Sequence, residues 1–147
     1  MTKKPRDPKR RLATIMAADI VGFSRLMHAD EEGTYTALRT ARTEVIEPRM
    51  EEYGGRIVKH LGDGFLAEFP TVMAAVQFAM SLQEEEGRRG EGIPRNQQIK
   101  FRIGINLGDI IVDDDGDIFG DGVNVAARLE SLAIPGEIGR ASCRERV

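Results

Sequence analysis

Residues 56–69 read RIVKHLGDGFLAEF, and this stretch decides the fold. Two short runs, 56–61 and 65–69, flank the tripeptide Gly-Asp-Gly. An Asp-Gly pair between alternating segments is a strong short-range signal for a β-hairpin, so Asp63 is predicted at the tip of a tight turn. The hairpin supplies two neighbouring antiparallel strands around which the rest of the chain can be arranged.

Upstream of the hairpin, the sequence predicts one strand and one long helix. Residues 12–20, LATIMAADI, form a near-continuous apolar run that ends in an acid, a pattern typical of a strand covered on both faces. Residues 31–53 have helical spacing of apolar positions. We expect Pro48 to kink or interrupt that helix and Gly54 to end it.

Downstream, Thr71 is predicted to cap a helix over 72–86, and a last helix is predicted over 120–132. Residues 99–108 and 109–117 are interpreted as a second hairpin. The element order is that of a split βαβ pattern. The predicted fold class is α+β, a ferredoxin-like, mostly antiparallel sheet with helices packed on one face.

Composition excludes several classes of protein. The chain has 147 residues, 41% hydrophobic and 31% charged, with a formal net charge of −3, which is ordinary for one globular domain. The basic run from Lys3 to Arg11 is interpreted as a tail or linker rather than a nucleic-acid-binding face. The single cysteine, Cys143, excludes an internal disulfide and a Cys-rich metal site.

No apolar run approaches the roughly 18 residues that cross a bilayer, and no apolar stretch follows the basic start as in a signal peptide. The sequence therefore predicts a cytoplasmic protein without direct membrane insertion.

Two aspartates are predicted to meet at one rim of the sheet. A crossover through a helix makes the first and second strands parallel, so that Asp19 and Asp63, 44 positions apart, lie at the same edge. Two carboxylates there suit Mg²⁺ or Mn²⁺, which bind through a few acids and substrate phosphates. Each aspartate alone has a structural alternative, a helix cap for Asp19 and a hairpin turn for Asp63. Exposed N–H groups near Gly22 and Ser24 favour phosphate binding.

Other motif interpretations fail on this sequence. GDGFLA offers GxGxxA, but a strand rather than a helix follows it, which disfavours a dinucleotide fold. A calcium loop at DDDGD would need glycine at Ile118. The Gly-x-Ser-x-Gly motif of hydrolases does not occur, and the turn LGDGF lacks the second acid of diguanylate cyclases. His28 and His60 are interpreted as surface residues.

Four segments together resemble the motifs of the class III adenylate/guanylate cyclase catalytic domain of bacterial type. They are ADIVGFSRL (18–26), VKHLGDGFLAEF (58–69), RIGINLGD (102–109) and DIFGDGVNVAARLE (117–130). Their order and spacing match over about residues 12–138, so the resemblance is far more specific than any one short pattern.

The resemblance implies roles for particular residues. Asp19, Ile20 and Asp63 occupy the metal-binding positions, for two divalent cations (Mg or Mn), and Gly22, Phe23 and Ser24 lie where phosphates bind. Lys59 occupies the position of the purine-reading lysine and Asp117 that of its acidic partner. Asn124 and Arg128 match the asparagine that orients the ribose and the arginine that stabilises the transition state.

The chemistry of these side chains agrees with the implied roles. Lysine can donate to adenine N1 and aspartate can accept from the exocyclic amine, which favours ATP over GTP. Asn124 and Arg128 stand at i and i+4, on one helix face. In the resembled family, one protomer supplies the metal aspartates and its partner supplies the base-reading and arginine residues. The resemblance therefore implies a homodimer with sites shared between protomers.

The sequence departs from the family in two places. Asp109 stands where many members carry a phosphate-binding arginine, and the loop from Gly108 to Asp117 is short, which implies a reduced dimer arm. The family continues beyond residue 138 with a strand, a helix and a lysine-bearing segment, whereas residues 139–147, GRASCRERV, lack strand alternation. The domain is therefore predicted over 12–138, incomplete at its C-terminus, after a tail over 1–11 and before a non-native tail over 139–147.

The predicted function is adenylate cyclase, converting ATP to 3′,5′-cyclic AMP and diphosphate in signal transduction. The alternative is a catalytically silent nucleotide-binding or dimerisation domain of a signalling protein. Asp109 and the C-terminal departure favour silence for this polypeptide.

Overall fold

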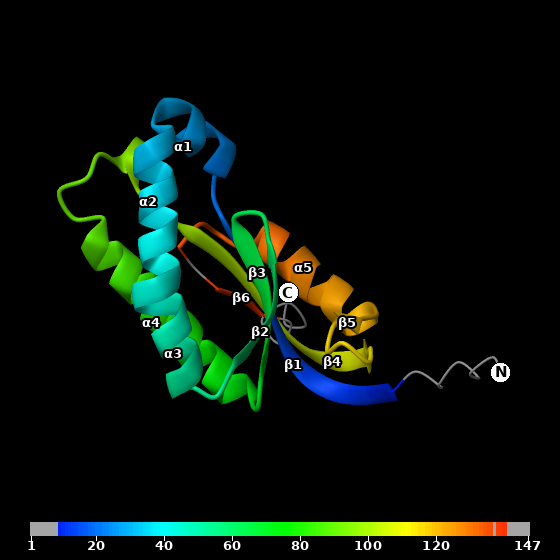
Figure 1. Cartoon of the computed structure of the whole chain (residues 1–147). Coiled ribbons are helices and arrows are strands. Elements are labelled where there is room, and N and C mark those ends of the chain that lie inside the picture. The colour runs from blue at the N-terminus through cyan, green and yellow to red at the C-terminus, as the bar shows by residue number, and fades with distance from the viewer. Residues whose placement is uncertain (1–8, 137, 141–147) are drawn as a thin grey trace.

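The computed structural model describes residues 9–136 and 138–140, and only the backbone of the last three. A curved sheet has the strand order β2-β3-β1-β4-β5, and β6 pairs with β4 (Figure 1). The β4–β6 pairing is parallel and the others are antiparallel. The strands are β1 (Lys9–Ile20), β2 (Arg56–Leu61), β3 (Gly64–Phe69), β4 (Phe101–Val112), β5 (Ile118–Phe119) and β6 (Ile138–Arg140). The split βαβ order and the Gly-Asp-Gly hairpin are confirmed.

The helical segments follow the predicted order with two additions, the short helix α1 directly after β1 and a 3₁₀ turn before β4. They are α1 (Phe23–Ala29), α2 (Glu31–Ala41), a π-helical turn (Arg42–Ile46), α3 (Glu47–Glu52), α4 (Val72–Arg89), a 3₁₀ turn (Arg95–Gln97) and α5 (Asp121–Leu132). Thr71 caps α4, since its hydroxyl accepts from the N–H of Ala74 at 3.0 Å. The predicted interruption near Pro48 is present as the π-helical turn, because proline lacks the N–H that the α-helical ladder needs.

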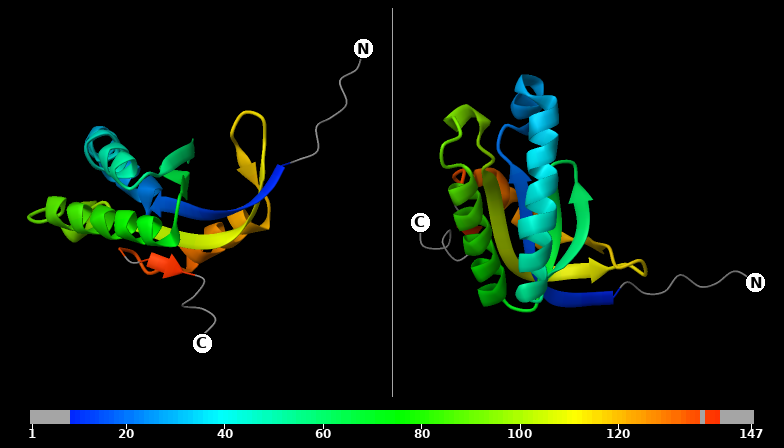
Figure 2. Two further views of the ribbon diagram at one scale, coloured as in Figure 1. Left: turned by 90° about the horizontal axis from the view of Figure 1, so that it is seen from below. Right: turned by 60° about the vertical axis from the view of Figure 1, so that its left-hand side comes forward.

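Helices cover both faces of the sheet, which corrects the prediction that they pack on one face (Figure 2). Even-numbered residues of β1, such as Met16 and Ala18, pack with Val45 and Phe78 in the larger core under α2, α3 and α4. Odd-numbered residues, such as Ile15, pack in a second core with residues of α5. A strand that is apolar on both faces stabilises the fold only when both faces are covered.

The predicted second hairpin was wrong in its position. Residues 101–112 form the single strand β4, paired with β1 along its whole length, and the reversal comes at residues 113–117. The misleading signal was Gly108, at the predicted turn. A Cβ on Gly108 would lie 3.1 Å from Cα of Gly122, so this glycine admits the start of α5 rather than a turn.

The backbone of residues 138–140 forms β6, although the sequence predicts no strand at 139 and 140. Backbone pairing with β4 explains the difference, because it needs no alternation of side chains. The rest of the predicted tail, 141–147, and the basic residues 1–8 lie outside the described residues. Among the described helices, none has the length and apolar character needed to cross a membrane.

Candidate active site

Asp19 and Asp63 meet at one rim of the sheet, as the topology predicts. β1 and β2 both run antiparallel to β3, so they are parallel to each other and their carboxyl ends share a rim. Asp63 lies in the turn after β2, and its Oδ2 accepts a hydrogen bond of 2.8 Å from the backbone N–H of Ile20. The turn thus reaches across β3 to the end of β1.

Two glycines shape the turn that carries Asp63. A Cβ on Gly64 would lie 2.1 Å from the carbonyl oxygen of Ala18 and 2.9 Å from Cβ of Asp19, so only glycine allows this approach. Gly62 has φ of +62°, the left-handed conformation that a tight turn requires. The side chain of Arg42, from the π-helical turn, donates to the Gly62 carbonyl at 2.8 Å and fixes the tip.

A buried acid behind Asp19 was missed by the sequence prediction. Glu130 on α5 is 9% exposed and shares a hydrogen bond with Asp19. Burial raises the pKa of Glu130 to about 8, and the hydrogen bond and negative charge of Asp19 add to the rise, with a smaller contribution from Asp63. Arg102 pairs with Asp19 across β1 and β4, and its positive charge lowers the pKa of Glu130. Asp19 therefore faces α5, like the other odd-numbered residues of β1.

The predicted phosphate-binding residues lie at the junction of β1 and α1. Gly22 adopts φ of +62° and precedes α1, which begins at Phe23 and Ser24. The first-turn N–H groups of a helix have no partners within the helix and suit an anion. Asp63 contacts Ile20, so the predicted phosphate-binding residues begin two positions after a residue that Asp63 touches.

The donor set fits a hard divalent cation. Asp19 and Asp63 provide carboxylate oxygens beside the backbone of Ile20, and such oxygens are the ligands that Mg²⁺ and Mn²⁺ prefer. Among the described residues, no group of three or more His, Cys, Asp or Glu side chains is arranged to hold a metal ion. A cation at this rim therefore needs further oxygens, which a triphosphate and water can supply.

Lys59 and Asp117, predicted as a base-reading pair, are in direct contact. Nζ of Lys59 lies 3.1 Å from Oδ1 of Asp117 and 3.2 Å from its Oδ2. Nζ also lies 5.4 Å from the centre of the Phe119 ring, which is 46% exposed. The Lys59 hydrogen bond, with one from the N–H of Ile118, lowers the pKa of Asp117. An ammonium, a carboxylate and an exposed aromatic ring thus gather on one surface.

Asn124 and Arg128 lie on the outer face of α5. The buried residues of that helix, Gly122, Ala126, Leu129 and Glu130, mark the side that packs on the sheet. With 100° between successive residues, Asn124 and Arg128 fall on the opposite side, and both are exposed. Within the described part of the chain, Arg128 makes a long ion pair of 3.9 Å with Asp121. The structure does not bring these two side chains to Asp19 within one chain.

The sequence and the fold both match a known family. Residues 7–142 match the family model of the adenylate and guanylate cyclase catalytic domain. The chain belongs to this family.

Two relatives of this cyclase domain are named as adenylate cyclases. It is 49% identical over 130 residues to "Putative adenylate cyclase 3" of Rhizobium meliloti, covering 88% of this chain and 22% of that protein. It is 37% identical to an adenylate cyclase of Streptomyces coelicolor, covering 84% of this chain and 30% of that protein. The chain thus spans less than a third of the length of these relatives.

The fold of the cyclase domain also matches a solved structure. A crystal structure from Silicibacter pomeroyi, described as an adenylate/guanylate cyclase/hydrolase, superposes with a TM-score of 0.84 at 45% identity. The match covers 96% of this chain and 84% of that chain. The predicted family and the ferredoxin-like α+β fold class are therefore confirmed, except that helices cover both faces of the sheet.

Proposed function

We propose that this domain is an adenylate cyclase that converts ATP to 3′,5′-cyclic AMP and diphosphate by in-line attack of the 3′-hydroxyl. The observation that carries the proposal is the meeting of Asp19 and Asp63 at one rim, joined through the Ile20 N–H. Divalent cations held there would activate the attacking hydroxyl and stabilise the departing phosphate. The relatives named adenylate cyclase support the same reaction.

The roles of the protein's own groups follow from their chemistry. Asp19 and Asp63 supply negative charge where cations and a triphosphate gather, and the N–H groups around Gly22 to Ser24 orient phosphate oxygens. The side-chain amide of Asn124 donates hydrogen bonds to the ribose and accepts hydrogen bonds from it. Arg128 neutralises charge that develops on the phosphate as the bond to the leaving group lengthens.

Base preference is assigned to Lys59 and Asp117. Their contact places a donor and an acceptor side by side on one surface, 3.1 Å apart. Lysine donates to adenine N1 while Asp117 accepts from the exocyclic amine. Guanine presents the opposite polarity at both atoms, so ATP is preferred over GTP. This substrate places the reaction in the cytoplasm, where ATP is available, as part of cyclic-nucleotide signalling.

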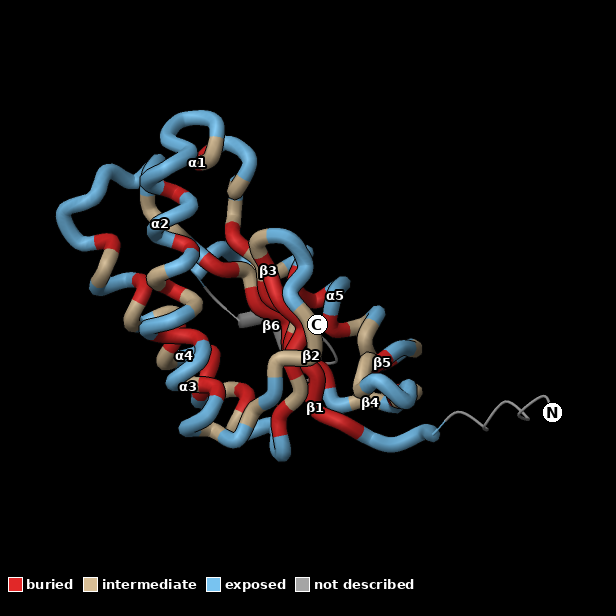
Figure 3. Tube along the Cα trace, in the orientation of Figure 1, coloured by how far each residue is buried: buried red, intermediate tan, exposed pale blue. Residues whose placement is uncertain are grey.

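We infer that the active form is a homodimer in which each site takes residues from both protomers. Asn124 and Arg128 point away from the sheet that carries Asp19 in their own chain. The ends of β1 and β4 also extend beyond the α2–α4 layer, where Leu12 and Leu107 are 62% and 52% exposed (Figure 3). The β1–β4 register makes these leucines diagonal neighbours on one face, which a second copy would bury.

A catalytically silent domain is the second candidate. Asp109, where many family members carry a phosphate-binding arginine, is exposed on β4 and cannot hold a phosphate. Such a domain would still dimerise and bind nucleotide. Incubation with ATP and Mn²⁺ distinguishes the two, because a silent domain would bind ATP without forming cyclic AMP.

The direct test is incubation with ATP or GTP in the presence of Mn²⁺ and identification of the product. We expect cyclic AMP from ATP, loss of product in Asp63→Ala, and a shift away from ATP in Lys59→Glu. Unchanged turnover in Asp63→Ala would show that the metal-binding role of this residue is wrong.

A further inference from the structure

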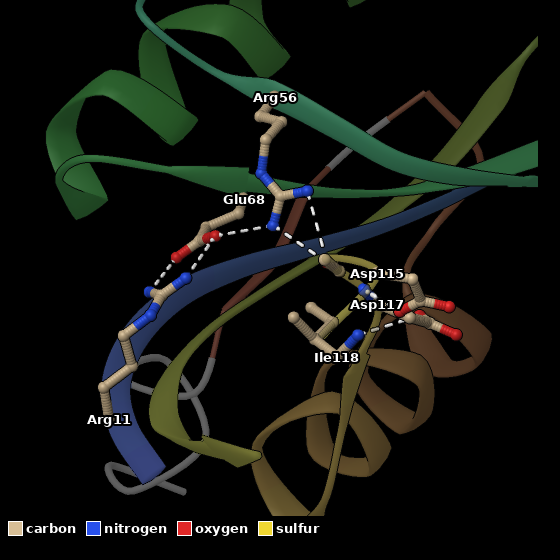
Figure 4. Close-up of polar contacts among 7 residues, drawn as sticks. Arg11, Arg56, Glu68, Asp115, Asp117 and Ile118 are labelled. Carbon is tan, nitrogen blue, oxygen red and sulfur yellow. Dashed lines mark hydrogen bonds and ion pairs between the residues drawn. The ribbon is translucent and has the colours of Figure 1, made fainter. Parts of the chain in front are cut away.

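The loop over residues 113–117 carries Asp117 and is tied to strand β2 at two points. One is the ion pair between Lys59 and Asp117, at 3.1 Å. The other comes from Arg56, whose Nη1 and Nη2 both donate to the carbonyl oxygen of Gly116 at 3.3 Å (Figure 4). The two contacts differ in kind, because Lys59 holds a side chain that the substrate would use, whereas Arg56 holds the backbone beside it.

Arg56 is itself held by a network that crosses three strands. Its Nη2 donates to Oε1 of Glu68 on β3 at 3.1 Å. Glu68 also accepts two hydrogen bonds from Arg11 on β1, that from Nη2 being 2.8 Å long. The Glu68 side chain is only 13% exposed. The hydrogen bond from Arg11 lowers the pKa of Glu68, with Arg56 contributing further. The carboxylate is therefore a fixed anchor that sets the direction of the Arg56 guanidinium.

The loop transmits this constraint to Asp117 because its own hydrogen bonds make it one unit. The N–H of Gly116 donates to the Asp113 carbonyl at 3.0 Å, and the N–H of Asp113 donates to the Asp117 carbonyl at 2.9 Å. The N–H of Asp117 donates to Oδ1 of Asp115 at 2.9 Å. Gly116 itself adopts φ of +88°, which fixes the turn. A grip on the Gly116 carbonyl therefore positions the next residue, Asp117.

We propose that Arg56, oriented by Glu68, is a positioning residue that sets the base selectivity of the site by holding the loop that carries Asp117. This rests on the proposed function. When a base accepts from Lys59 and donates to Asp117, the direct ion pair between them is weakened, since both partners turn to the ligand. The Arg56–Gly116 contact uses no group that the base needs, so it keeps the loop in place while the nucleotide is bound.

Two measurements test the proposal on the full chain. The first is the ratio of kcat/KM for ATP to that for GTP with Mn²⁺, for the unmodified chain and for Arg56→Ala. We expect this ratio to fall about tenfold in Arg56→Ala, through a higher KM for ATP more than a lower kcat, because a hydrogen-bonded carboxylate then loses its fixed place. Arg56→Lys should recover part of the ratio, since lysine keeps the charge but not the fork of donors.

The second measurement is hydrogen exchange of the peptide covering residues 113–118 in the nucleotide-free chain. We expect faster exchange in Arg56→Ala and in Glu68→Gln, which weakens the anchor without removing Arg56. The matched control is Arg49→Ala, which removes another exposed arginine paired with a carboxylate, at 2.8 Å from Glu52 on α3. It should change neither the exchange nor the ratio.

An unchanged ATP-to-GTP ratio in an active Arg56→Ala variant, or unchanged exchange of the loop, would overturn the positioning role. Failure of the proposed function looks different, because the unmodified chain would then make no cyclic nucleotide from either substrate while the exchange experiment still reports on the loop.

Discussion

At the scale of single residues, the burial of Glu130 beside Asp19 has a measurable consequence. The folded domain raises the pKa of this carboxyl from its ordinary value near 4.5 to about 8, mainly through burial. Between those two pH values the unfolded chain has released the proton that the folded chain still holds. The free energy of unfolding therefore falls as the pH rises through this window.

We predict that Glu130→Gln removes this part of the pH dependence, because the amide is neutral at every pH in the window. Urea denaturation of both proteins across the window measures the effect. The unmodified chain should lose stability relative to Glu130→Gln toward the alkaline end. The exposed Glu84→Gln serves as the control and should parallel the unmodified chain. Parallel curves for Glu130→Gln would contradict the prediction.

Glu68 gives a pH dependence of opposite sign. Its pKa is lowered in the folded domain, first by the hydrogen bond from Arg11, so its contribution to stability is present above the unfolded pKa and is lost as the pH falls through the folded pKa. We predict that Glu68→Gln loses less stability on acidification than the unmodified chain. The denaturant midpoint, measured across the acidic pH range, gives this difference. An equal acid loss in both proteins would count against the network.

The positions of some residues of the candidate site could be predicted from the sequence, and those of others could not. Asp19 and Asp63 were predictable because strand direction alone sets which ends share a rim, and Lys59 and Asp117 because the resemblance fixed their positions. Glu130 and Arg102 were not. A glutamate two positions after Arg128 has the appearance of helix-surface charge, and its burial depends on the packing of α5 against Gly104, which sequence periodicity does not encode.

At the scale of elements, the packing of α5 on β4 depends on small residues. A Cβ on Gly104 would lie 2.3 Å from both the Ala126 carbonyl oxygen and the Glu130 N atom, and both obstacles are backbone. A Cβ on Gly122, from the other side of the contact, would lie 2.6 Å from the carbonyl oxygen of Asp109. The helix therefore lies directly on the strand, and it carries Glu130 to Asp19.

We predict that Gly104→Ala destabilises the domain by about 1–3 kcal/mol, because α5 must move away from β4. Gly87→Ala is the matched control, since a Cβ there meets nothing within 4 Å and the residue lies in helix α4. It should stabilise by about 0.5–1 kcal/mol through helix propensity. Chemical denaturation of the two variants measures the difference, and equal stability of both would show that the close approach is not needed.

The elements themselves were predictable where local signals agree with tertiary packing. The Gly-Asp-Gly hairpin and the Thr71 cap are local, and both were found. The glycines of β4 led to the wrongly placed second hairpin, because a glycine that admits a helix backbone and a glycine that starts a turn look alike in sequence. The apolar run over 12–20 already indicated coverage of both faces, but the sequence did not say that α5 supplies the second layer.

At the scale of the whole molecule, one chain leaves both the outer face of α5, with Asn124 and Arg128, and an apolar strand surface uncovered. Leu12 and Leu107 are exposed on the projecting ends of β1 and β4. We predict that Leu107→Lys weakens self-association and lowers cyclase activity per chain at a fixed concentration, because a charge replaces apolar surface at the contact. Sedimentation velocity measures the association. The exposed Met80→Lys on α4, away from this surface, should leave it unchanged.

We propose that Asp63 and Arg128 act in the same site but come from different chains. Asp63→Ala and Arg128→Ala should each abolish activity alone, and a mixture tests the claim. Random exchange in an equal mixture makes half of the dimers mixed, each with one intact site, so we predict recovery of about a quarter of the unmodified activity. A mixture as inactive as its two components, under conditions where the chains exchange, would contradict the account.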